Sequence, residues 1–173
     1  MRVEWSDLAG VVLEVAVRHE DVRGSFDKLY ESRDRGSLTA SQLCTSFNRA
    51  SGTVRGLHVQ VAPHLEHKSL WCTSGKLFDV LVDMREEEPT YGDWAAVNLS
   101  AAQPCLLRLP PGIAHGYQTL ADATAVTYLI DGTFAPLSAR TIRWNDAKLG
   151  IDWPLPMTVI SDSDRDGLSW PVS

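Results

Sequence analysis

Short strand-like segments separated by turn residues run through the whole chain, and this rhythm constrains the fold more than any other feature. The segments are rich in β-branched and aromatic residues, and Gly, Pro, Ser or Asp stand between most of them. Such residues favour strands, and the intervening residues favour turns. Examples are VVLEVAV, TVRGLHVQV, LFDVLVDM, PCLLRLP and ATAVTYLID. The pattern predicts an all-β fold, either a sandwich or a jelly roll.

Length and charge limit the number of domains and the classes of partner. The chain has 173 residues, 44% of them hydrophobic and 22% charged, as in ordinary globular proteins. One domain spanning residues 1–173 is expected at this length. The net charge of −6 argues against a protein that coats nucleic acid, although a local basic pocket for a small anion is compatible with it.

The N-terminus and the cysteines indicate the cellular compartment. MRVEWSDLAG has no basic segment followed by an apolar stretch, and the later run GVVLEVAV is too short to span a bilayer. We therefore expect a cytoplasmic protein with no membrane partner. The cysteines Cys44, Cys72 and Cys105 have no zinc-binding spacing, and we expect them to be reduced and mostly buried.

Helical and irregular segments are few. LTASQLCTSF at 38–47, with Thr39 as a possible cap, is the main helical candidate, and APLSARTIRW and WNDAKLG could each form a turn or a short helix. The acidic run at 85–89 predicts a solvated hairpin connection. The proline-containing C-terminal tail predicts a segment that wraps back over the body.

The stretch LPPGIAHG has the spacing Pro-x-Gly-x-x-His, which predicts a rigid turn that presents His115 inward. It resembles the second motif of cupins, small jelly-roll barrels that often hold a metal. Their His-x-His pair is missing here. His58, Glu66 and His115 could still meet around a metal, but we expect no metal site. His64 and His67 are expected to be exposed loop residues.

A longer set of motifs resembles one family. TVRGLHVQV, PTYG, LPPGIAHG, TYLI and RWND followed by GIDWP occur in this order, and the similarity covers roughly residues 10 to 166. The chain resembles the dTDP-4-dehydrorhamnose 3,5-epimerase family. The resemblance implies a cupin-type jelly-roll barrel with a few short accessory helices and no metal or cofactor. It also implies a homodimer that exchanges an N-terminal strand, and a nucleoside-diphosphate 4-keto-6-deoxyhexose as substrate.

Epimerisation next to a ketone requires a base, a partner for the enolate oxygen and an acid on the opposite face. The resemblance implies that His58 is the base, Lys68 stabilises the enolate and Tyr128 is the acid. It also implies that a carboxylate of SDSD orients the base, Asp164 being the first choice and Asp162 the second. Without the motifs, Lys68 would be interpreted as a surface lysine and Tyr128 as a core tyrosine.

Further positions are implied to bind the substrate. The resemblance assigns Arg55 and His115 to the sugar or diphosphate, and Asp79 to the same pocket; Arg55 could instead pair with Asp79 inside the barrel. Arg23 and Phe26 of VRGSF are implied to contact the nucleotide. The chain departs from the family pattern at two nucleotide-contacting positions, Lys28 and Phe134.

The sequence leaves several functions open. The leading prediction is epimerisation at C5, or at C3 and C5, of a nucleotide-linked 4-keto-6-deoxy sugar. The same enolate would serve a single-carbon epimerase or a 3,4-ketoisomerase, because the choice of carbon depends on the fine geometry of the pocket. A sugar-nucleotide-binding jelly roll without catalysis is the alternative from another class.

Overall fold

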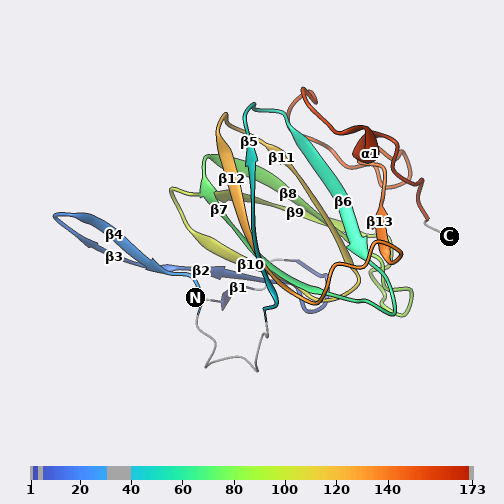
Figure 1. The fold of residues 1–173 in the computed structure, drawn as a ribbon, viewed down its shortest axis with the longest axis horizontal. Helices are drawn as coiled ribbons and strands as arrows, with labels where there is room; N and C mark the ends of the chain where they lie inside the picture. The colour runs from blue at the N-terminus through green and yellow to red at the C-terminus, as the bar shows by residue number, and fades with distance from the viewer. Residues whose placement is uncertain (1, 4–5, 31–39, 172–173) are drawn as a thin grey trace.

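The computed structural model describes residues 2–3, 6–30 and 40–171, which form a two-sheet β-barrel with a hairpin that projects from it (Figure 1). The predicted all-β class is confirmed. The strands are β1 (Arg2–Val3), β2 (Val12–Val15), β3 (Val17–Asp21), β4 (Gly24–Lys28), β5 (Gln42–Asn48), β6 (Val54–Gln60), β7 (His67–Ser74), β8 (Lys76–Asp83), β9 (Trp94–Ser100), β10 (Cys105–Leu109), β11 (Ile113–Thr119), β12 (Thr124–Asp131) and β13 (Ala139–Thr141).

Two sheets form the barrel walls, and the order of their strands brings distant parts of the sequence together. The six-stranded sheet has the order β1-β2-β10-β7-β12-β5, and the five-stranded sheet has the order β13-β6-β11-β8-β9. Every pairing between these strands is antiparallel. The connection between β8 and β9 contains the acidic run, and Glu86 and Glu87 are exposed there as expected.

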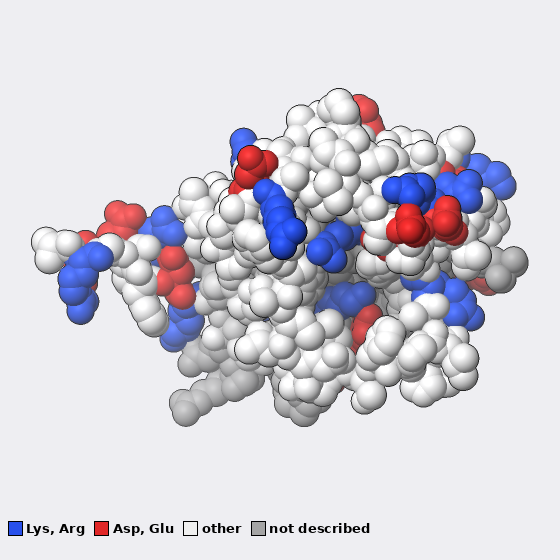
Figure 2. All heavy atoms as spheres, turned by 45° about the horizontal axis from the view of Figure 1, so that its top comes forward, with Lys and Arg blue, Asp and Glu red and all other residues white. Residues whose placement is uncertain are grey.

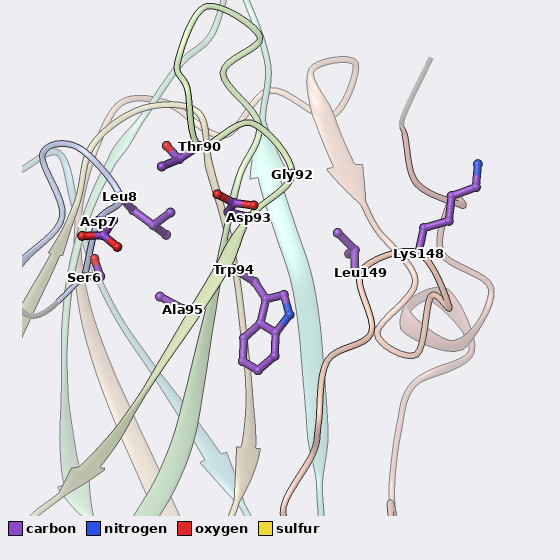
Figure 3. A pocket seen from close by; sticks show the side chains of 10 residues that line it. All are labelled: Ser6, Asp7, Leu8, Thr90, Gly92, Asp93, Trp94, Ala95, Lys148 and Leu149. Atoms are coloured by element: carbon purple, nitrogen blue, oxygen red, sulfur yellow. The ribbon is translucent and has the colours of Figure 1, made fainter.

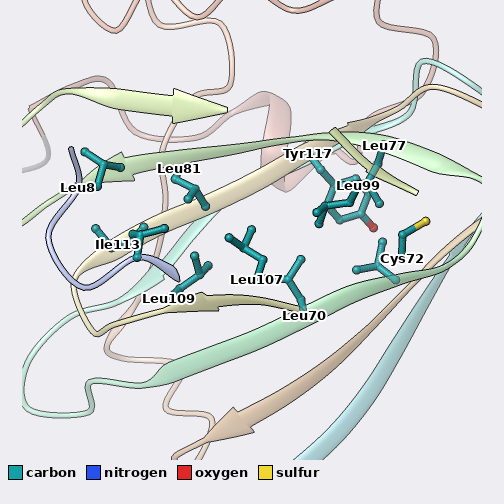
Figure 4. Close-up of a cluster of buried hydrophobic side chains, with 12 residues drawn as sticks. Leu8, Leu70, Cys72, Leu77, Leu81, Leu99, Leu107, Leu109, Ile113 and Tyr117 are labelled. Carbon is teal, nitrogen blue, oxygen red and sulfur yellow. The ribbon is translucent and has the colours of Figure 1, made fainter. Parts of the chain in front are cut away.

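An apolar cluster fills the space between the two sheets, as Figure 4 shows. It consists mainly of leucines from β7, β8, β9 and β10, together with Ile113 and Tyr117 of β11. Leu70, Leu77, Leu81 and Leu107 are fully buried. Side chains alternate between the faces of a strand, so each sheet contributes every second residue to this core.

A second cluster covers the outer face of the five-stranded sheet. Val80 and Val82, which alternate with the inward residues of β8, pack there with Trp153 and Trp170 of the C-terminal segment. That segment also contains the only α-helix in the described ranges, α1 (Asp162–Arg165). No helix among the described residues has the length and hydropathy needed to cross a membrane.

Strands β3 and β4 pair only with each other and extend away from the barrel (Figure 1). Val17 and Phe26 of this hairpin are exposed, Phe26 to 67%. An isolated two-stranded hairpin is marginally stable in water, because it lacks a sheet or a helix to pack against. The hairpin therefore presents apolar surface that the single chain does not cover.

The helix predicted at 38–47 is wrong in its described part, because Gln42–Asn48 forms the edge strand β5. Leu43 and Phe47 point outward while Ser46 and Asn48 point inward, and the strand pairs along its length with β12. Thr39 lies outside the described residues. The segments 135–144 and 144–150 contain turns and β13 rather than helices.

The three cysteines are all free thiols, as expected, but only Cys72 is buried. Cys105 is partly buried and Cys44 is exposed. The expectation of mostly buried thiols is therefore wrong for Cys44. Its strand lies at an edge of the sheet and its side chain faces an open cleft, which accounts for the exposure.

Candidate active site

A cleft opens between the two sheets at one end of the apolar core. It has a volume of about 270 Å³ and is lined by Cys44, Thr45, Ser46, Arg55, His58, Lys68, His115, Tyr117, Tyr128 and Ile130. An adjoining hollow of about 410 Å³ shares His58, Lys68 and Ile130 with it and adds Phe134 and Arg140. Figure 2 shows Lys and Arg side chains beside a hollow near the middle of the face that it displays.

His58 is held by a carboxylate at the side of the cleft. Its Nε2 lies 2.7 Å from Asp164 Oδ1. An ionised carboxylate only accepts hydrogen bonds, so Nε2 carries the proton and Nδ1 keeps a lone pair. The His58 side chain is 46% exposed and that of Asp164 only 7%. The pair can therefore act as a base whose orientation is fixed from the buried side.

Asp164 is itself positioned by α1 and by β6. Ser161 caps the helix and accepts from the backbone N of Asp164, and the backbone N of Gly56 donates to Asp164 Oδ2 over 3.2 Å. Burial raises the pKa of the Asp164 carboxyl, but the bonds from His58, Gly56 and Ser161 together lower it by more. The net pKa therefore lies below its usual value. The carboxylate therefore stays charged next to the imidazole. Asp162, the fallback, is exposed and pairs with Arg165.

Gly56, between Arg55 and His58, is required by a close approach of two backbones. Its φ is +109°, and a Cβ placed there would lie 2.6 Å from the Cα of Gly116 and 2.7 Å from the carbonyl oxygen of His115. No other residue fits this space without a shift of β11. The glycine thus lets β6 and β11 approach closely where they present His58 and His115.

Tyr128 enters the same cleft from the opposite sheet. It belongs to β12, next to β7, and its ring lies 6.2 Å from that of His115, edge to face. Burial, reinforced by the neighbouring Tyr117, raises the pKa of the Tyr128 phenol well above its usual value. The hydroxyl therefore stays protonated and can donate, which is what an acid requires.

Lys68 lies on β7 and pairs with Ile130 of β12. Tyr128 is two residues from Ile130 on the same face of β12, so Lys68 and Tyr128 are diagonal neighbours. Its Nζ is 2.8 Å from Glu66 Oε1, and its side chain is 13% exposed. A fixed ammonium in a partly dry cleft is suited to stabilise charge on an enolate oxygen.

His115 and Asp79 form a second imidazole and carboxylate pair, which is deeply buried. His115 Nε2 lies 2.9 Å from Asp79 Oδ2, and Asp79 is completely buried. Burial raises the pKa of the Asp79 carboxyl, an effect that the nearby His115 opposes. Asp79 therefore orients His115 toward the cleft but does not line it.

Arg55 makes a different contact from the one considered as an alternative. Its Nε donates to Asn48 Oδ1 over 2.8 Å, and Asp79 pairs with His115. The Arg55–Asp79 pair is therefore not formed. Asn48 is buried, and its Nδ2 donates to the Tyr117 hydroxyl and to the Thr124 carbonyl. The guanidinium is thus held at the cleft with its terminal nitrogens available to an anion.

Arg23 and Phe26 lie on the projecting hairpin and not in the cleft of their own chain. Arg23 donates to the Asp21 carboxylate at 2.6 Å and is exposed. Lys28 is at the end of β4, and Phe134 lines the hollow beside the cleft. The nucleotide roles implied for Arg23 and Phe26 stay predictions.

The structure does not assemble the metal trio that the sequence allowed. His58 pairs with Asp164, His115 pairs with Asp79, and Glu66 pairs with Lys68. Among the described residues, no group of three or more His, Cys, Asp or Glu side chains could hold a metal ion. His64 and His67 are both exposed as expected, but His67 is the first residue of β7, and only His64, which contacts Ser138, lies in a loop.

Sequence reasoning did not identify Ser46 or Asn48, and it considered Glu66 only as a possible metal ligand. Ser46 bonds to the Tyr117 hydroxyl at 2.7 Å, Asn48 holds Arg55, and Glu66 holds Lys68. Ser46 lies in the segment predicted as a helix and Asn48 directly follows it, so the alternation that turns both inward was not predicted. The spacing of Glu66 and Lys68 was a usable signal, since residues two apart on a strand share a face.

A larger hollow of about 540 Å³ lies at the start of β9 (Figure 3). Asp7, Asp93, Trp94 and Lys148 are among the residues that line it. None of the predicted site residues does, and it has no histidine or tyrosine in its lining. The candidate active site is therefore the cleft that contains His58 and Tyr128.

Comparisons with known proteins show which family the chain resembles. The family profile described as dTDP-4-dehydrorhamnose 3,5-epimerase matches residues 6–171. The Shigella flexneri enzyme of that name is 39% identical over 116 residues, which are 67% of this chain and 64% of that relative. The Mycobacterium tuberculosis enzyme is 35% identical over 172 residues, covering 96% of this chain and 85% of the relative.

Two further comparisons are with a relative named as a 3-epimerase and with a solved structure. The dTDP-4-dehydrorhamnose 3-epimerase of Streptomyces niveus is 36% identical over 97% of this chain and 83% of its own length. The crystal structure of the Bacillus anthracis 3,5-epimerase with TDP and PPi bound superposes with a TM-score of 0.91 at 31% identity, covering 96% of this chain and 98% of that one. The chain belongs to the dTDP-4-dehydrorhamnose 3,5-epimerase family, an isomerase family with a cupin-like barrel.

Proposed function

We propose that the protein epimerises a dTDP-linked 4-keto-6-deoxyhexose at C5, or at C3 and C5, through an enolate. The observation that carries this proposal is that His58 and Tyr128 line one cleft from opposite sheets. A ring bound between them would meet a base on one face and an acid on the other, which is the condition for inversion. The activity of the family relatives supports the same conclusion.

The steps follow from the residues around the ring. His58 removes the proton beside the ketone through Nδ1, and Asp164 stabilises the imidazolium that forms. Lys68 stabilises the charge on the enolate oxygen. Tyr128 then donates a proton to the carbon from the other face. Arg55 would bind the diphosphate, because a guanidinium can donate two bonds to phosphate oxygens.

Single-carbon epimerisation is the second candidate, and the Streptomyces niveus relative favours it by its name and its coverage of this chain. Incubation with dTDP-4-keto-6-deoxyglucose in deuterated water separates the candidates. Deuterium at C3 and C5 with inversion at both supports the double epimerase, and deuterium at one carbon supports the restricted enzyme. Movement of the keto group indicates a 3,4-ketoisomerase, and no deuterium at all refutes epimerisation of this substrate.

We also propose that the protein works as a homodimer. The exposed apolar side chains of the β3–β4 hairpin, and Leu43 and Phe47 on the outer face of β5, support a second copy as the partner. Arg23 and Phe26 would then reach the partner's nucleotide, and strand exchange is one way to bring them there. Light scattering after gel filtration measures the assembly: a dimer mass supports the proposal and a monomer mass refutes it. A cytoplasmic location remains a prediction from the sequence.

A further inference from the structure

A carboxylate that has no part in the proposed chemistry lies against one of the cleft's cations. Glu66 immediately precedes β7, and Lys68 is the second residue of that strand. Glu66 Oε1 lies 2.8 Å from Lys68 Nζ, and the two side chains are only 10% and 13% exposed. Side chains two residues apart in an extended segment point to the same side, so both groups face the cleft region together.

The second oxygen of Glu66 is also occupied. Gln60, the buried last residue of β6, donates from Nε2 to Glu66 Oε2 over 3.0 Å. The other end of the Gln60 amide accepts from the backbone N of Ala135 at 2.6 Å. The carboxylate is therefore held at both oxygens, and a chain of contacts connects Lys68 to the five-stranded sheet.

Charge around the cleft makes Glu66 unusual. The residues that line the cleft and the adjoining hollow include the cations Arg55, Lys68 and Arg140, and Glu66 is the only carboxylate among them. A negative charge there opposes the binding of a diphosphate and the formation of an enolate. The direct contact between Glu66 and Lys68 gives a reason for a carboxylate at this place, because a poorly hydrated ammonium is costly without a counterion.

We propose that Glu66 is a positioning residue that holds the Lys68 ammonium in place and directs it at the enolate oxygen. The inference rests on the proposed function and adds a residue to it. Glu66 acts through Lys68 and does not touch the sugar. If Glu66 were lost, the Lys68 chain would be free to leave the cleft for water, and the enolate would form more slowly while binding of the nucleotide stayed the same.

The first test separates kcat from KM. Removing a fixed donor from an oxyanion costs about 10²–10³ in kcat, so misplacing one in Glu66→Gln should lower kcat about tenfold and change KM less than about twofold. In the Lys68→Met background the same substitution should lower kcat no further, because Glu66 acts only through Lys68. An unchanged kcat in Glu66→Gln, or an equal loss in the Lys68→Met background, would overturn the proposal.

Glu14→Gln is the matched control. Glu14 and Arg108 form an ion pair at 3.1 Å with similar burial, 16% and 15% exposed, and neither residue lines the cleft. Both substitutions remove one carboxylate from a partly buried pair, so both should reduce thermal stability. Only Glu66→Gln should reduce kcat; an equal fall in Glu14→Gln would mean that the loss reflects stability alone.

The second test does not depend on turnover. A lysine amine that can move into water reacts with an acylating reagent faster than one held in an ion pair, so Lys68 should be labelled several-fold faster in Glu66→Gln than in the wild type or in Glu14→Gln, as followed by peptide mass spectrometry. Equal labelling in all three would overturn the role of Glu66. If the wild type incorporates no deuterium from solvent but the labelling rates differ, the proposed function fails and the ion-pair role of Glu66 stands.

Discussion

The apolar end and the polar end of the barrel interior are built by the same strands. Leu70 of β7 and Val126 of β12 lie in the apolar cluster, and two residues away on the same strands Lys68 and Tyr128 line the cleft. In β11, Ile113 lies in the apolar cluster, and His115, two residues later, lines the cleft. Since residues two apart share a face, each strand continues one inward row from core into site. The leucines therefore fix the positions of the proposed catalytic groups, although they take no part in the proposed chemistry.

The difference between the two ends predicts that substitutions will separate activity from stability. The largest effect on activity is expected at His58. His58→Asn should lower kcat by about 10²–10⁴, because it removes the base. The free energy of unfolding should fall only by about 1 kcal/mol, because the 46% exposed His58 side chain buries little area but gives up its bond to Asp164. Turnover and urea unfolding measure both quantities, and a large loss of stability would contradict the separation.

The next effect is expected at the apolar end, where stability should fall and activity should be kept. Leu70→Ala should lower the free energy of unfolding by about 2–5 kcal/mol, because it removes a fully buried side chain from the tightly packed cluster. The kcat of the molecules that remain folded should stay close to wild type. If kcat instead falls as far as in His58→Asn while the fold survives, the core also controls the chemistry.

Asp164 is expected to affect both activity and stability, and its effect on stability should depend on pH. Its pKa is lowered in the folded protein, so its carboxylate contributes stability that is present above the ordinary aspartate value of about 4 and is lost as pH falls through the folded value. Asp164→Asn should therefore be less stable than wild type at neutral pH, and the difference should shrink in acid. It should also lower kcat by about 10²-fold, because the amide supports the imidazolium poorly. A stability difference that is constant from pH 7 to pH 3 would contradict this assignment.

The smallest effect is expected at Arg55. Arg55→Lys keeps the charge but loses the forked geometry and the bond from Nε to Asn48. KM should rise several-fold with kcat nearly unchanged, as steady-state kinetics can show. Arg140→Lys is the matched substitution in the adjoining hollow, and it tests whether replacing the forked guanidinium there also raises KM.

Much of the fold and of the site followed from local sequence, and the failures share a cause. The strand rhythm predicted the all-β class, and the short motifs that contain His58, His115 and Tyr128 led to the family. The helix predicted over β5 failed because that strand is specified by its pairing with β12, about eighty residues later in the chain. Pairing over such distances does not show in local periodicity. Asn48 was missed for the same reason, since it matters through its bond to Arg55, a contact that only the folded barrel creates.

The account depends on an acid and a base that act from opposite faces of one ring. Its most direct test is the stereochemistry of solvent deuterium uptake by Tyr128→Phe, with dTDP-4-keto-6-deoxyglucose as substrate. His58 remains able to remove the proton and, being solvent-exposed, to return a deuteron to the same face. We therefore predict that Tyr128→Phe incorporates deuterium at the reacting carbon with retained configuration, whereas the wild type incorporates it with inversion. Inversion by Tyr128→Phe at the wild-type rate would contradict the account.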